Sequence, residues 1–121
     1  MKRLFYLLFA GIFAGILLFG SCEKVVYPPV VIEPPDTAVS YSLDIQPIWN
    51  DKCVNCHGGS RDPDLRQENS YDALTNGGYI NTSEPEESEL MKKLYGSHDS
   101  RALEAEKQLI LLWIEEGAKN N

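Results

Sequence analysis

The chain has 121 residues, which limits it to one small folded domain. It carries 11 Lys and Arg residues against 18 Asp and Glu residues, a formal net charge of −7 at pH 7. Because an acidic surface repels phosphate backbones, this charge excludes nucleic acid from the expected partners.

Residues 1–21 are predicted to be an export signal. Lys2 and Arg3 precede an apolar run from Leu4 to Gly20, which is the order of a signal peptide. The run is also near the lower limit for a membrane-spanning helix, so a single permanent span is the alternative. Removal of Lys2 and Arg3 with the signal leaves 9 basic residues against the same 18 acidic ones.

The stretch "LLFGSC" resembles the end of a bacterial lipoprotein signal, because Gly20 and Ser21 precede Cys22. The resemblance implies that Cys22 is lipidated and becomes the new N-terminus. An acylated cysteine tethers a protein to a membrane surface without spanning it. We therefore expect the chain in the cell envelope, lipid-anchored and facing the periplasm or the exterior.

Residues 22–40 are predicted to be a Pro-rich tether. The doublets Pro28-Pro29 and Pro34-Pro35 favour extended polyproline geometry, which gives a semi-rigid spacer. A disordered tail is the alternative. The folded domain is expected to cover residues 41–121.

Residues 41–53 are predicted to contain a short helix that leads into Cys53. Apolar residues recur there at near-helical spacing: Leu43, Ile45, Ile48 and Trp49. Ser42 or Asp44 is suited to cap its start, and Pro47 is compatible only with a first turn.

Three further helices are predicted. Residues 70–78 have Ser70 near the N-cap and Gly77 or Gly78 at the end. In residues 83–96, Ser83 and Glu86 have the spacing of a capping box, and Gly96 ends the helix.

The last helix, in residues 103–117, has the clearest apolar face. That face is made by Leu103, Leu109, Ile110, Trp113 and Ile114. Gly117 supplies the C-terminal signal. Since the domain has no strand pattern, the predicted fold class is all-α, with three to five short helices.

The chemistry is concentrated in "DKCVNCHGG", residues 51–59. A structural zinc site would need four ligands, and Cys53, Cys56, His57 and His98 are the only Cys and His residues of the domain. Adjacent Cys56 and His57 are awkward ligands for one tetrahedral ion. A redox dithiol would sit at a helix N-terminus in a βαβ context, which the pattern does not indicate.

A c-type haem attachment site uses every residue of the stretch. The thiols of Cys53 and Cys56 would form thioethers with the haem, and His57 would be the proximal iron ligand. Gly58 and Gly59 would let the backbone leave the crowded ring. Export suits this chemistry, because covalent haem attachment takes place outside the bacterial cytoplasm.

The segments "DIQPIWNDKCVNCHGG", "SYDALTNGGYIN" and "KQLILLWIEEGAKNN" resemble the small planctomycete-type branch of the cytochrome c family. The resemblance runs from Tyr41 to Asn121. It implies a cytochrome c-like fold, in which the first and last helices cross and one covalent haem c fills the core. Ile45, Ile48 and Trp49 would then meet the apolar face of the last helix, with Trp49 and Trp113 as core residues.

The second axial ligand is where the chain departs from that family, whose members commonly have a methionine followed by proline shortly before the last helix. This chain has "YGSHDSRALEAEK" there. Three possibilities stay open: His98, Met91, or an open or water-bound iron.

The expected function is single-electron transfer by a membrane-anchored monohaem cytochrome, with redox proteins of the envelope as partners and no enzymatic activity. Asp44, Asp51, Glu86 and Glu87 are expected to cap helices or face solvent. One alternative is a five-coordinate haem sensor or peroxidase-like enzyme. The other is a haem-free interaction lipoprotein with a Cys53–Cys56 disulfide.

Overall fold

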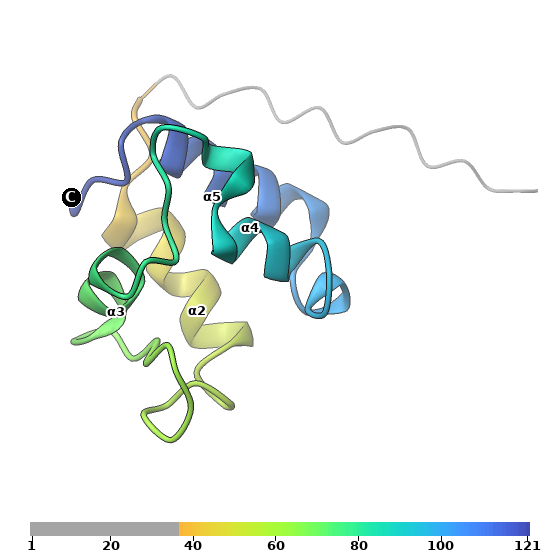
Figure 1. Cartoon of the computed structure of the whole chain (residues 1–121). Helices are drawn as coiled ribbons and strands as arrows, with labels where there is room; N and C mark the ends of the chain where they lie inside the picture. Colours follow the sequence, from red (N-terminus) through yellow and green to blue (C-terminus); the bar gives the residue numbers. More distant parts are fainter. Residues whose placement is uncertain (1–36) are drawn as a thin grey trace, which may run out of the picture.

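The computed structural model describes residues 37–121, and all structural statements concern this range (Figure 1). The predicted signal, Cys22 and most of the tether lie outside it. Residues 37–121 contain helices and no strand, so the predicted all-α class is confirmed for them. No helix in this range is long and apolar enough to cross a membrane.

Seven helical elements follow one another in the described range, and most of them are short. They are η1 (Tyr41–Ile45), α2 (Gln46–Lys52), α3 (Ser70–Asn76), η2 (Pro85–Glu87), α4 (Glu89–Leu94), η3 (Asp99–Arg101) and α5 (Glu104–Glu115). Of these, η1 is a π-helical turn, and η2 and η3 are 3₁₀ turns.

The predicted helix before Cys53 is present, but it begins at Tyr41 and its cap is Ser40. The side chain of Ser40 accepts a hydrogen bond from Leu43 N at 3.3 Å, and Asp44 Oδ2 accepts one from Ser40 N at 2.8 Å. The prediction of Ser42 or Asp44 as the cap was therefore wrong. Pro47, which has no N–H, stands where the π-helical turn passes into α2.

Aromatic rings join the first helical segment to α5. The Tyr41 ring centroid lies 5.1 Å from that of Trp113 and 5.2 Å from that of Tyr71. Trp49 and Trp113 are both fully buried, which confirms that they are core residues. Ile45, Ile48 and Trp49 share one core with Ile110, Trp113 and Ile114, and Leu109 packs against it.

The C-terminal residue, Asn121, is hydrogen-bonded to the first helical segment. The backbone carbonyl of Asn121 accepts a hydrogen bond from Ser42 N at 2.9 Å, and its side-chain Oδ1 accepts one from Tyr41 N at 2.8 Å. The two ends of the described range therefore lie together, as Figure 1 shows.

Ser70 is the first residue of α3 and takes part in a buried polar chain. Its hydroxyl donates to Gln46 Oε1 at 2.5 Å and accepts from the Tyr41 hydroxyl at 2.7 Å. Burial raises the pKa of Tyr41, and the bond to Ser70 offsets part of this. Among the described residues, Trp49 Nε1 is the buried side-chain polar atom without a hydrogen-bond partner.

The single helix predicted over residues 83–96 is wrong, because the chain breaks at Ser88. Ser88 has an extended ψ of 136°, and its hydroxyl accepts a hydrogen bond from Asn81 N at 2.9 Å. The N-cap residues of the two elements in this range are Glu84 and Ser88, so Ser83 does not cap a helix. Two short pieces, η2 and α4, replace the predicted helix.

α5 forms as predicted, except at its start. Leu103 is 63% exposed, and its N–H donates to Glu106 Oε2 at 2.6 Å. Leu103 therefore precedes the helix and does not belong to its buried face. Gly117 ends the helix with a φ of 96°, a conformation that favours glycine.

Ile110→Ala is expected to lower the free energy of unfolding by about 2–5 kcal/mol, because Ile110 is fully buried and the substitution leaves a cavity. Leu43→Ala is the control. Leu43 is 78% exposed, so its loss should change stability by no more than about 0.5 kcal/mol. Urea unfolding of both variants measures the difference, and equal losses would contradict the core described here.

Candidate functional site

The two cysteines and the histidine of the motif lie in a turn that continues α2. Cys53 N donates to Trp49 O at 2.9 Å, and His57 N donates to Cys53 O at 2.9 Å. Residues three and four apart in such a turn share one face. Cys53, Cys56 and His57 therefore present their side chains to the same side of the chain.

Gly58 and Gly59 let the chain turn sharply after His57. A Cβ on Gly58 would lie 2.9 Å from Val54 O. Gly59 has a φ of 94°, and a Cβ there would lie 2.8 Å from Arg66 Nη2. Neither position has room for a larger residue without a local shift.

A cavity of about 330 Å³ adjoins this turn. It is lined by all four Cys and His residues of the domain, which are Cys53, Cys56, His57 and His98. Its other walls are largely apolar and come from Trp49, Leu65, Tyr79, Leu90 and Leu94. The volume is at the lower end of the range of about 300–1,000 Å³ for cofactor and ligand pockets.

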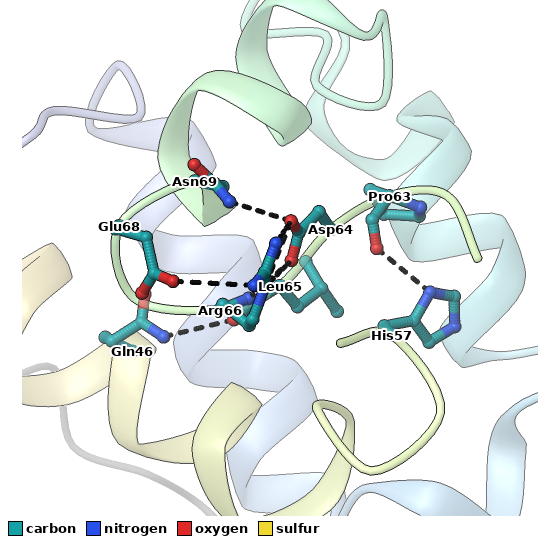
Figure 2. Close-up of polar contacts among 8 residues, drawn as sticks. All are labelled: Gln46, His57, Pro63, Asp64, Leu65, Arg66, Glu68 and Asn69. Carbon is teal, nitrogen blue, oxygen red and sulfur yellow. Dashed lines mark hydrogen bonds and ion pairs between the residues drawn. The ribbon is translucent and has the colours of Figure 1, made fainter. Parts of the chain in front are cut away.

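His57 is oriented by the loop that follows it. Its Nδ1 lies 3.0 Å from the carbonyl oxygen of Pro63, as Figure 2 shows. Since a carbonyl only accepts, Nδ1 carries the proton, which leaves the lone pair on Nε2. A backbone partner of this kind is typical of histidines that bind metal ions.

The residues after Pro63 form a polar network (Figure 2). Asp64 accepts hydrogen bonds from Arg66 Nη2 at 2.6 Å and from Asn69 Nδ2 at 2.7 Å. The Leu65 carbonyl accepts from Gln46 Nε2 at 3.3 Å. These contacts attach the segment that carries Pro63 to α2 and α3, and so they support the orientation of His57.

Asp64 is expected to give the protein an acid-dependent stability. The Arg66 guanidinium beside it lowers the pKa of Asp64 from its ordinary value of about 3.9. A carboxyl group whose pKa is lower in the folded state stabilises that state at pH values above its pKa in the unfolded chain. This stabilisation is lost as the pH falls through the pKa of the folded state. Urea midpoints should therefore fall more steeply below pH ~4 in the wild type than in Asp64→Asn.

Asp72→Asn is the control for this measurement. It removes an exposed carboxylate that forms no ion pair within the described range, so its urea midpoints should follow the wild-type pH dependence. Parallel curves for the wild type and Asp64→Asn would contradict the role given to the Asp64–Arg66 pair.

His98 reaches the cavity from the loop before η3. Its backbone N–H donates to Lys93 O at 2.9 Å, and its carbonyl accepts from Arg101 N at 2.8 Å. Ser97 Oγ lies 2.9 Å from His98 Nδ1. This nitrogen is engaged, so ligation by His98 would fall to Nε2.

The separation of the two histidines is compatible with one ion between them. Their ring centroids are 6.2 Å apart, with an interplanar angle of 47°. Imidazole nitrogens bind metal ions at about 2.0–2.1 Å, and each nitrogen lies roughly 1 Å from the centroid of its ring. Two rings that bind one ion from opposite sides therefore have centroids about 6 Å apart.

Met91 lies elsewhere. It is 2% exposed and belongs to the hydrophobic core, and it is not among the residues that line the cavity. A methionine in that position supplies packing to α4 and α5. His98 is therefore the better placed of the two candidate ligands.

The geometry disfavours a redox dithiol at Cys53. Cys53 stands at the C-terminal end of α2, whereas reactive thiols are favoured at helix N-termini. Burial, together with the charge of Glu106, raises the pKa of Cys53 to about 11. Both Cys53 and Cys56 are free thiols in the structure.

Within residues 37–121, no three His, Cys, Asp or Glu side chains lie together as ligands for one metal ion. The four residues considered for a zinc site all line the cavity, but they do not form such a group. Two of these four residues, His57 and His98, are the histidines whose rings lie 6.2 Å apart.

The cavity has a cationic border, formed by Lys52, Arg61, Lys93 and Arg101. Lys52 lies 3.5 Å from Glu106, and Lys93 lies 3.3 Å from Glu89. The one carboxylate among the lining residues is Asp62. Within the described range Arg61 and Arg101 are in no ion pair, so in an acidic protein these two residues favour anionic groups at the cavity.

No family model, no curated protein and no solved structure matches this chain.

Some residues of the site had no signal in the sequence. Pro63 acts through its backbone carbonyl, which residue type does not reveal. Lys107 is buried beside the His98 loop, although its neighbours in the sequence are the polar residues Glu106 and Gln108. The spacing of Asp64 and Arg66 suits a local ion pair. Only the fold shows that this pair stabilises the segment of Pro63, whose carbonyl contacts His57.

Proposed function

We propose that this chain is a monohaem c-type cytochrome that transfers single electrons in the cell envelope, with a cytochrome c-like fold and a lipid anchor on Cys22. The observation that carries the proposal is the cavity. Two free thiols, an oriented histidine and a second histidine 6.2 Å away all line one largely apolar space.

The residues present fit a covalently attached haem. Cys53 and Cys56 would hold it through thioether bonds, and His57 would bind the iron through Nε2. His98 is the proposed second ligand. The cationic border of the cavity suits the carboxylates that a haem carries.

The bound group would supply an iron centre that cycles between the ferric and ferrous states. The protein's own part is to hold and insulate that centre. Pro63 fixes the protonated nitrogen of His57, and Trp49, Leu65 and Leu94 line the cavity with apolar surface. Two histidine ligands would favour a lower potential than a histidine and methionine pair. No acid or base side chain is required, so the chain is proposed as a carrier and not as an enzyme.

The proposal is tested on the purified full-length protein, matured in a host that attaches haem c. We expect reduction by dithionite and full reoxidation by air or ferricyanide, repeatable over several cycles. A protein that carries no haem, or that cannot complete this cycle, would refute the proposal. In the first case, the haem-free lipoprotein with a disulfide becomes the better interpretation.

A further inference from the structure

Lys107 is a buried cation beside the loop that carries His98. Its side chain is only 4% exposed, and its Nζ lies 2.5 Å from Asp99 Oδ1 and 3.7 Å from Glu104 Oε2. A buried ammonium group is costly unless it is paired, so these contacts keep Lys107 and Asp99 together.

A tyrosine completes the group. Lys107 Nζ lies 4.8 Å from the ring centroid of Tyr95, a cation–π distance, and the Tyr95 hydroxyl donates to Glu104 Oε1 at 2.7 Å. We call Tyr95, Asp99, Glu104 and Lys107 the Lys107 cluster. Two of its members belong to α5, and the other two enclose the loop residues 96–98.

His98 lies inside this enclosed segment, directly before Asp99. Its backbone is bonded to Lys93 and Arg101, which belong to α4 and η3. Those bonds are local to the segment. Within the described range, the Lys107 cluster ties the segment through its side chains to α5, which is anchored in the core through Ile110, Trp113 and Ile114.

We propose that Lys107 is a positioning residue that keeps His98 at the cavity, with its ring near that of His57. The inference rests on the proposed function, since it gives His98 a role as second iron ligand. Loss of the Lys107 ammonium leaves Asp99, whose side chain is 67% exposed, free to turn to water. The population in which His98 has left the cavity then rises.

The test compares Lys107→Met with the wild type, both as full-length haem proteins. We expect carbon monoxide to bind the ferrous form about tenfold faster in the variant, the size of change expected when one charge-assisted contact is lost. The amide hydrogens of His98 and Arg101 should also exchange faster. His98→Ala sets the upper limit of the carbon monoxide rate.

Two controls separate positioning from general destabilisation. Lys92→Met removes another lysine, whose Nζ lies 3.0 Å from Glu87 on the surface, and should bind carbon monoxide like the wild type. Ile45→Val weakens the core at a residue outside the cluster, α5 and the cavity lining, so it should lower the melting temperature and leave the carbon monoxide rate unchanged.

Wild-type carbon monoxide binding in Lys107→Met, with fast binding in His98→Ala, would overturn the positioning role and leave the proposed function standing. Unchanged binding in His98→Ala would overturn both His98 as ligand and the role of Lys107. If Lys107→Met does not fold, Asp99→Asn replaces it. That variant should shift the rate in the same direction, and a wild-type rate would overturn the inference.

Discussion

A Cys53→Ser/Cys56→Ser double variant should yield a full-length chain that shows no haem stain after denaturing electrophoresis. The wild type should stain strongly, because thioether bonds survive denaturation and non-covalent haem does not. Serine keeps the approximate size of each side chain but cannot form a thioether. Since both thiols line the cavity, removing them should abolish covalent attachment without removing a core residue.

Cys22→Ser is the matched control. It removes the third cysteine of the chain, so it should keep the haem stain and lose the lipid. Mass spectrometry of the intact protein reads out both modifications. A stained double variant would show that the cysteine pair does not attach the group, and the proposed function would fail with it.

His98→Ala should change the proposed iron site from six-coordinate to five-coordinate. We expect the low-spin EPR signal to be lost, and carbon monoxide to bind the ferrous form faster by about 100-fold, since the binding-competent fraction is no longer limited by His98. The physical basis is the 6.2 Å separation of the His57 and His98 rings, both of which line the cavity.

Met91→Leu is the control for this experiment, because it conserves volume at a buried position that does not line the cavity. Its spectrum and its carbon monoxide rate should match the wild type. If Met91→Leu opened the site and His98→Ala did not, Met91 would be the ligand. Rapid carbon monoxide binding by the wild type itself would favour a five-coordinate sensor or peroxidase-like enzyme.

Local patterns in the sequence were enough to predict much of the fold. The apolar face of α5 and the glycine that ends it follow from spacing alone, because they depend on residues close in the chain. The buried positions of Trp49 and Trp113 follow from their size and their place in apolar patterns. Cys56 and His57 follow Cys53 by three and four residues, so a helical turn brings both to the face of Cys53.

Features that depend on distant partners were missed. The break at Ser88 arises because Asn81 bonds to its hydroxyl, and the local sequence still favours a continuous helix. Leu103 fits the helical period, yet it lies before α5 begins. The burial of Lys107 needs Asp99 and Tyr95 to arrive from another segment. The sequence suggested His98 as a candidate ligand, but its distance from His57 required the fold.

The basic border of the cavity has a consequence for encounters with other molecules. The chain as a whole is strongly acidic, so its net charge alone would repel anionic partners at long range, while the border attracts them at short range. Added salt weakens both effects, and the direction in which an association rate responds to ionic strength reports which of them dominates. For an anionic reactant, a rate that falls with added salt would mean that it approaches through the border of Lys52, Arg61, Lys93 and Arg101, against the sign of the molecule's total charge.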